Sequence, residues 1–233
     1  MTPQQQRLRM STDQLLYPIV VLDLDGTLVD SVYQHVVAWQ WAFRAVGLRV
    51  SATRVHEAIG MGGDRLVSQV AGEAAERAVG DEVRKVHDER FKTLIWSVSE
   101  LDGASDLMRE LIEQGHRLVL ASSGEAELVE ELLDSVDARA GLGAVLTGSD
   151  ASQSKPAPDL IEAAMSRMGT GDAVVVGDAT WDALAAAAAG VPCVGLLSGG
   201  IDASRLRAAG AAWVYEGPRD LLQRLEESPL GQR

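Results

Sequence analysis

The chain has 233 residues and a formal net charge of −13, and 46% of its residues are hydrophobic. This length suffices for one large domain, or for one domain that carries an insertion, with a sizeable core. The acidic balance argues against a general nucleic-acid binder and against a polybasic membrane contact, because both need clusters of Lys and Arg.

Residues 1–15 contain Gln and Arg but no apolar segment, so we expect a disordered leader rather than a signal peptide. The chain has no apolar stretch long enough to predict a transmembrane helix. Cys193 is the only cysteine, and it lies in an apolar run without a His or a cation beside it. We therefore expect a core cysteine in a protein of the reducing cytoplasm.

The first apolar run, residues 18–22, is followed by Asp-Leu-Asp-Gly-Thr. Its β-branched residues predict a buried strand, and Gly26 indicates where the strand ends. Asp23 and Asp25 would then lie at the carboxyl end of the strand, where open parallel sheets bind ligands. Two carboxylates this close repel each other, so the pKa of one should rise and their roles should separate. One could act as a nucleophile and the other could transfer protons.

The character of the chain changes between residues 31 and 97. No convincing strand occurs there, and apolar periodicity predicts helices over about 31–46, 51–59, 63–79 and 81–96. We therefore expect an inserted all-helical domain at residues 31–97, with the core domain at residues 16–30 and 98–233. The loop containing Gly62 and Gly63 either faces a substrate or is a plain turn between helices.

A second apolar strand, at about residues 117–122, ends in Ser122, Ser123 and a glycine. A hydroxyl and backbone N–H groups at a helix start can bind phosphate, although capping the helix is the commoner use of Ser. Further along, Lys155 precedes a proline-rich helix start. It could supply a positive charge to a phosphate, or it could be a solvated surface charge.

A later apolar strand, at about residues 173–177, leads to Asp178 and then to Asp182 one helical turn further on. These two residues could cap a helix, but they also offer the hard oxygen ligands that Mg²⁺ prefers. Taken together, the apolar runs predict strands near residues 18–23, 117–122, 143–147, 173–177, 193–196 and 212–215. Strands that alternate with helical segments predict an α/β fold: a Rossmann-like parallel sheet with helices on both faces, plus the helical insertion.

The order of these motifs resembles that of the haloacid dehalogenase-like superfamily, in the branch of phosphoglycolate phosphatases and β-phosphoglucomutases. The likeness covers most of the chain, and in this branch the insertion is a helical cap over the active site. The resemblance implies a Mg²⁺-dependent phosphatase that acts on a small phosphorylated metabolite, either a sugar phosphate or a compound like phosphoglycolate. A non-catalytic binding protein of the same fold is less favoured, because every catalytic position is filled.

The resemblance also implies a role for each motif residue. Asp23 would become the aspartyl-phosphate, and Asp25 would be the general acid and base, which dehalogenases lack. Phosphoryl oxygens would be bound by Ser122, Ser123 and Lys155. The residues that would hold Mg²⁺ are Asp23, Asp25 through its carbonyl, Asp178, and Asp182 either directly or indirectly.

Residues of the cap bear on the choice between a phosphatase and a sugar phosphomutase. His35 lies ten residues after Asp25, as in the mutase, but it could equally be a hydrogen-bonded helix residue. The mutase has an arginine for the second phosphate where this chain has Gly62 and Gly63, although Arg65 is near. Glu125 follows the serine motif and would repel a doubly phosphorylated intermediate. These departures favour the phosphatase, and the oligomeric state is not predicted.

Overall fold

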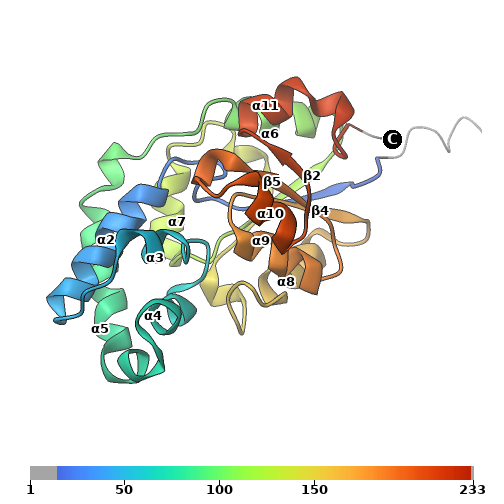
Figure 1. The fold of residues 1–233 in the computed structure, drawn as a ribbon. Helices are drawn as coiled ribbons and strands as arrows, with labels where there is room; N and C mark the ends of the chain where they lie inside the picture. Colours follow the sequence, from blue (N-terminus) through green and yellow to red (C-terminus); the bar gives the residue numbers. More distant parts are fainter. Residues whose placement is uncertain (1–14, 232–233) are drawn as a thin grey trace, which may run out of the picture.

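Residues 15–231 are described by the computed structural model of the protein, and residues 1–14 of the predicted leader lie outside them. Six parallel strands form one sheet in the order β3-β2-β1-β4-β5-β6 (Figure 1). The strands are β1 (Ile19–Leu22), β2 (Arg117–Ala121), β3 (Leu142–Leu146), β4 (Ala173–Gly177), β5 (Cys193–Leu196) and β6 (Ala211–Tyr215). All six predicted strands are confirmed, and Cys193 is buried in β5.

Helices cover both faces of this sheet. Val20 and Leu22 of β1 share one apolar cluster with α6 (Ala104–Glu113), α7 (Ala126–Leu133) and α11 (Pro218–Gln223). Ile19 and Val21 share another with α8 (Asp159–Met168), α9 (Thr180–Ala188) and α10 (Ala203–Ala209). Successive residues of a strand point to opposite faces, and here both sets are buried, which is typical of a parallel sheet between helical layers. The predicted α/β class is therefore confirmed.

Between β1 and β2 the chain forms an all-helical cap, at the left of Figure 1. Its helices are α2 (Val32–Ala45), α3 (Ala52–His56), α4 (Gly63–Ala71) and α5 (Glu73–Lys92). They enclose an apolar cluster that is separate from the two clusters of the sheet and includes Trp39, Phe43 and Leu66. Short 3₁₀ turns complete the fold at Ile95–Ser97, Arg139–Gly141, Gly148–Asp150, Leu197–Gly199 and Leu225–Glu227.

The predicted junction between the last two cap helices was wrong. The sequence prediction ended one helix at residue 79 and began the next at residue 81, whereas the structure breaks the chain at Gly72 and carries α5 through Gly80. Gly72 has a φ of 90°, which a residue with a side chain rarely adopts. A glycine inside a helix costs only about 1 kcal/mol, and the packing of α5 against α2 and α4 offsets that cost.

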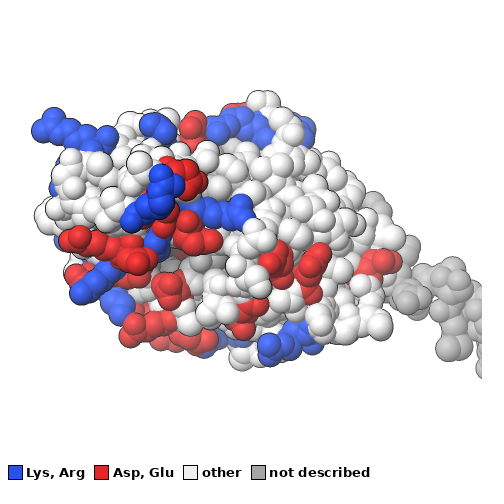
Figure 2. All heavy atoms as spheres, turned by 90° about the horizontal axis from the view of Figure 1, so that it is seen from below, with Lys and Arg blue, Asp and Glu red and all other residues white. Residues whose placement is uncertain are grey.

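The two chain crossings between the core and the cap lie side by side. The backbone N–H of Asp30 donates to the carbonyl of Ser99 at 2.9 Å, and that of Leu101 donates to the carbonyl of Leu28 at 2.9 Å. On the face drawn in Figure 2, charged side chains of both signs gather mainly over the cap side, at the left. Within residues 15–231, no helix combines the length and the apolarity that crossing a membrane requires.

Candidate active site

Asp23 and Asp178 lie side by side at the carboxyl edge of the sheet. They directly follow β1 and β4, which are hydrogen-bonded neighbours with Leu22 opposite Val176. The N–H of Asp23 continues this ladder by donating to the carbonyl of Val176 at 3.0 Å. Both side chains are buried. The parallel register therefore brings together two carboxylates that are far apart in the sequence.

The tight turn after β1 directs the side chain of Asp25 toward the cap. Gly26 has a φ of 75°, and its N–H donates to the carbonyl of Val29 at 2.8 Å, which closes the turn. A Cβ atom at this position would lie 2.4 Å from Oδ2 of Asp178, so only glycine fits between the two strand ends. Asp25, the residue directly before Gly26, lines a cavity between the core and the cap.

Lys155 is the cation at the floor of this site. Its ammonium donates to Oδ1 of Asp23 at 2.5 Å and lies 2.7 Å from Oδ1 of Asp182. The lysine side chain is fully buried. Burial disfavours its charged form, but the carboxylates of Asp182 and Asp23 outweigh that effect and raise the pKa of Lys155 above its ordinary value. The burial of Lys155 excludes a solvated surface charge, which was one of the two roles that its sequence position allowed.

The floor carries more negative than positive charge. Asp23, Asp178 and Asp182 offer carboxylate oxygens that all lie within 4.8 Å of one another, against the single ammonium of Lys155. Burial, together with the neighbouring carboxylates, raises the pKa of Asp23 to about 7 even though Lys155 lowers it. The pKa of Asp178 is raised well above its ordinary value for the same reasons, burial first. A divalent cation at this point would offset the excess charge, so the donor set fits a metal ion.

Asp25 has a different environment from Asp23. The hydroxyl of Ser31 donates to its Oδ1 at 2.5 Å, and Nε2 of His35 lies 3.0 Å from the same oxygen. Burial alone would raise the pKa of Asp25, but His35 and Ser31 hold it below its ordinary value. The expected separation of the two carboxylates is therefore present, with the pKa of Asp23 raised and that of Asp25 lowered.

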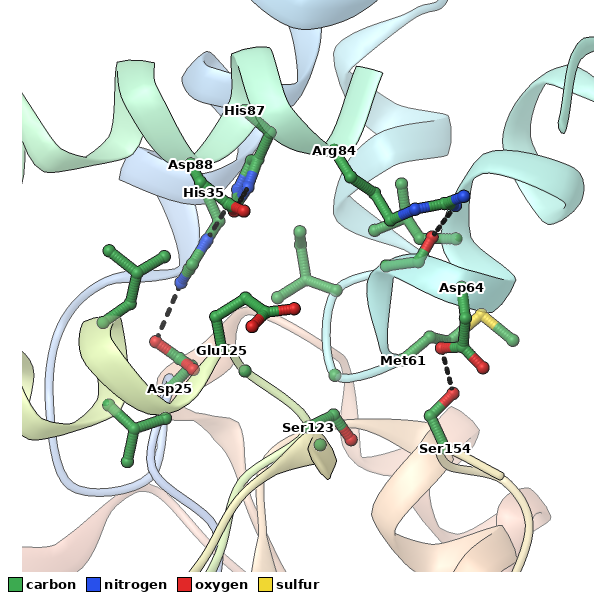
Figure 3. A pocket seen from close by; sticks show the side chains of 18 of the residues that line it. Asp25, His35, Met61, Asp64, Arg84, His87, Asp88, Ser123, Glu125 and Ser154 are labelled. Carbon is green, nitrogen blue, oxygen red and sulfur yellow. Dashed lines mark hydrogen bonds and ion pairs between the residues drawn. The ribbon is translucent and has the colours of Figure 1, made fainter. Parts of the chain in front are cut away.

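A chain of hydrogen bonds continues from Asp25 into the cap (Figure 3). Nδ1 of His35 lies 3.0 Å from Nε2 of His87, and Nδ1 of His87 lies 2.8 Å from Oδ1 of Asp88. Burial lowers the pKa of His87 to about 4, so its imidazole is neutral at pH 7. A neutral His87 that donates to Asp88 must accept from Nδ1 of His35. This chain of contacts therefore fixes the orientation of the His35 ring, whose Nε2 faces Oδ1 of Asp25.

The two serines of the second motif have different surroundings. Ser122 is buried, and its Oγ accepts a hydrogen bond from the N–H of Gly124 at 3.1 Å. The Oγ of Ser123 is buried without a hydrogen-bond partner among the described residues, and Ser123 lines the cavity. Since unpartnered buried hydroxyls are uncommon, Ser123 is well suited to donate to a bound oxygen atom.

The cavity above these residues has a volume of about 510 Å³ and lies between the core and the cap. Several contacts hold the cap against the core. Ser154 donates to Asp64 at 2.6 Å, and the indole N–H of Trp181 donates to the carbonyl of Glu57 at 3.0 Å. A cavity of this size above Asp23 and Asp25 is suited to a small molecule.

The cap residues that the sequence singled out do not all reach this cavity. His35 and Gly63 line it, whereas Gly62 is buried where a Cβ atom would lie 2.6 Å from that of Ser154. Arg65 does not line the cavity, because its guanidinium donates to the side chain of Gln153 at 2.6 Å. Arg65 therefore does not replace the missing arginine of the mutase.

Sequence reasoning missed the contribution of α5. Arg84, His87 and Asp88 of this helix all line the cavity, and Trp39 of α2 stacks on His87 with ring centroids 4.0 Å apart. The signal that could have found them is their spacing: positions i, i+3 and i+4 share one face of a helix. Polar residues that share one helix face are more often solvated, and only the docked cap shows that this face meets the site.

Comparisons with known proteins agree with this geometry. A model of the haloacid dehalogenase-like hydrolase family matches residues 17–190. The chain is 32% identical to a phosphoglycolate phosphatase of Photorhabdus laumondii over 77% of this chain and 80% of the relative. It is 28% identical to a validoxylamine A 7'-phosphate phosphatase of Streptomyces hygroscopicus, over 78% and 86%. A solved hydrolase structure from Pseudomonas syringae superposes with a TM-score of 0.86 at 35% identity, covering 92% of this chain and 99% of that one.

Proposed function

The chain belongs to the haloacid dehalogenase-like hydrolase family and is a phosphatase of that family, and we propose that it hydrolyses a small phosphomonoester through an aspartyl-phosphate on Asp23. The observation that carries this proposal is the floor of the cavity. There Asp23 is paired with Lys155, and Asp25 lies two residues away under a hydrogen-bonded histidine. A nucleophile, a cation and a proton carrier are what phosphoryl transfer requires.

In the first step, a carboxylate oxygen of Asp23 attacks phosphorus and the bond from phosphorus to the alcohol oxygen breaks. Asp25 gives its proton to the departing oxygen. In the second step, Asp25 takes a proton from a water molecule that attacks the same phosphorus, which releases phosphate and restores Asp23. The low pKa of Asp25 belongs to the substrate-free site, and an incoming phosphate dianion would raise it.

We propose Mg²⁺ as the cation, held by Asp23, Asp178 and the backbone carbonyl of Asp25. When bound, it would neutralise negative charge on the transferring phosphoryl group and would lower the pKa of Asp23. Asp182 acts through Lys155 in this proposal. Its Oδ1 faces the ammonium at 2.7 Å and its Oδ2 accepts from the N–H of Ala179 at 3.0 Å, so Asp182 orients Lys155.

Phosphoryl oxygens would be bound by Lys155, by the free hydroxyl of Ser123 and by backbone N–H groups near Ser122. We place the core domain at residues 16–30 and 98–233 and the cap at residues 31–97, with the cap excluding water from the reaction. The phosphatase is favoured over the mutase because Arg65 points away to Gln153. A mutase has to bind two phosphates in turn. The cytoplasmic location stays a prediction.

The test is Mg²⁺-dependent turnover of p-nitrophenyl phosphate by the wild-type protein and by Asp23→Asn. We expect a chelator to abolish turnover, Mg²⁺ to restore it, and Asp23→Asn to lower it by several orders of magnitude while the fold persists. Substitution of the exposed residue Asp30→Asn, in the same turn, serves as the control. Turnover by Asp23→Asn near the wild-type rate would contradict a covalent intermediate on Asp23.

A further inference from the structure

The cavity has two ends that differ in charge. Asp23 and Asp25 form its floor, and Lys155 contacts Asp23 without lining the cavity itself. Its far end lies toward α4, α5 and the start of α7, and four more carboxylates line it: Asp64, Asp81, Asp88 and Glu125. Figure 3 shows the carboxylate of Glu125 projecting into the cavity between Asp25 and Arg84. When the phosphate of a phosphomonoester binds at the floor, the alcohol part of the molecule would extend toward these four side chains.

The positive groups at this far end are already neutralised. Arg84 is the only Arg or Lys among the described residues that line the cavity. Its guanidinium donates to Glu76 at 2.8 and 3.0 Å, to Asp81 at 2.7 Å and to the carbonyl of Gly63 at 3.0 Å. Two carboxylates therefore face its single charge. His87 adds no charge at neutral pH, because burial lowers its pKa to about 4.

We propose that the substrate is a phosphomonoester whose alcohol part carries no second anion, and is either an uncharged polyhydroxy alcohol or one that bears an ammonium group. This inference rests on the proposed function and narrows it. A carboxylate or a second phosphate would meet these acidic side chains without an available cation. Asp64, Asp81 and Glu125 are exposed to solvent, so water screens part of the repulsion, and the rest opposes a second anion. Hydroxyl and ammonium groups would instead donate hydrogen bonds to the same carboxylates. The volume of about 510 Å³ accommodates a molecule of monosaccharide size.

The test compares substrates that are matched in size and differ in charge. Glucose 6-phosphate, glucosamine 6-phosphate and 6-phosphogluconate present a neutral, an ammonium and a carboxylate group on similar carbon chains. Ethanolamine phosphate and phosphoglycolate repeat the comparison with short chains. With Mg²⁺ present, we expect kcat/KM for each carboxylate compound to be at least about tenfold below that of its matched partner, which corresponds to ~1.4 kcal/mol.

Variants at Glu125 tie the preference to the cavity. Glu125→Gln should narrow the difference between glucose 6-phosphate and 6-phosphogluconate, and Glu125→Lys should narrow it further or reverse it. Glu131→Gln removes the same charge from the same helix outside the cavity, and should leave the ratio unchanged. An equal or higher kcat/KM for the carboxylate compounds in the wild-type protein would overturn the inference. The inference would also be overturned if neither Glu125 substitution changed the ratio of kcat/KM for glucose 6-phosphate to kcat/KM for 6-phosphogluconate.

The two proposals fail in different ways. Absence of turnover for p-nitrophenyl phosphate and for every compound of the panel would contradict the proposed phosphatase. Turnover of p-nitrophenyl phosphate without the expected charge preference would contradict the substrate class alone.

Discussion

The floor of the cavity and its cap end are built from different kinds of structure. Asp23 and Asp178 of the floor directly follow parallel strands, while Lys155 and Asp182 come from the segment before α8 and from α9. These charged groups are buried and held at fixed distances, as with Lys155 between Asp23 and Asp182. The cap end consists of side chains from helices and a loop, and several of them, such as Asp81 and Glu125, are exposed to solvent. In our proposal the reaction therefore depends on groups that the sheet and its covering helices hold in place, whereas the choice of substrate depends on side chains that can change at little cost in stability.

The largest expected effect comes from breaking the floor at Lys155. In Lys155→Met, the buried carboxylates of Asp23 and Asp182 lose their shared partner, so we expect a loss of about 3–5 kcal/mol in the free energy of unfolding. Phosphatase activity should fall by several orders of magnitude. Urea denaturation followed by circular dichroism measures the first quantity, and turnover of p-nitrophenyl phosphate measures the second.

A double variant separates stability from activity. Adding Asp182→Asn to Lys155→Met removes one of the two stranded charges and should recover part of the lost stability without restoring turnover. If Lys155→Met unfolds at the same urea concentration as the wild-type protein, the floor does not depend on this ion pair.

An intermediate effect is expected at the junction of the two ends, where His87 contacts His35. His87→Phe keeps a ring stacked on Trp39 but removes the acceptor for Nδ1 of His35, which loosens the hold on Asp25. We expect kcat for alkyl phosphates to fall by about 10²-fold, in the range of general acid catalysis. Turnover of p-nitrophenyl phosphate should change less, because its leaving group departs without a proton.

The exposed residue Glu89 on the same helix supplies the control, since Glu89→Gln should leave both rates unchanged. Equal losses for both kinds of substrate in His87→Phe would show that His87 only packs the cap. In that case His87 would contribute to the packing of the cap and not to the reaction, which would then depend on the floor.

The smallest expected effect is a pH-dependent thermal shift that reports on the floor alone. Since the pKa of Asp23 is raised to about 7 in the metal-free protein, the native state keeps this proton between about pH 4 and pH 7. The stability contributed by Asp23 is therefore lost as pH rises through about 7, and Mg²⁺ has to displace this proton at lower pH. We expect Mg²⁺ to raise Tm by more at pH 8 than at pH 5.5.

The variant Asp23→Asn lacks this proton, so its smaller Mg²⁺-induced shift in Tm should differ less between the two pH values, and the difference that remains comes from Asp178, whose pKa is also raised. A wild-type shift that is independent of pH would mean that Asp23 is already ionised without the metal. Differential scanning fluorimetry at matched ionic strength measures each of these shifts.

The contrast between floor and cap also explains what the sequence could predict. The strands and the residues that follow them were predictable, because a run such as residues 18–22 and the Asp23 and Asp25 after it are contiguous. The parallel register then brings such groups together, as it does for Asp23 and Asp178. Local sequence and one topological rule sufficed to bring these residues together at the floor.

The cap end could not be predicted in the same way. His87 and Asp88 reach the site only because α5 packs over the carboxyl edge of the sheet. Such packing of a helix depends on contacts between segments that are distant in the sequence. Propensity also misplaced the helix junction at Gly80 rather than Gly72, since either glycine can end a helix. Glu125 was noticed from the sequence, but its position in the cavity, near Asp25, required the folded chain.

The paired crossings at residues 28–30 and 99–101 have a consequence for engineering. Both splice points lie within one hydrogen-bonded step of each other, with Asp30 bonded to Ser99 at 2.9 Å and Leu28 bonded to Leu101 at 2.9 Å. A foreign insert whose own ends meet at that spacing can replace the whole segment between them without altering the strand order of the sheet. The cap can in this sense be exchanged as a unit, and chimeras would transfer the part of the selectivity that depends on Asp64, Asp81 and Asp88, whereas Glu125 would stay with the core and the insert would have to supply the partners of Asp25.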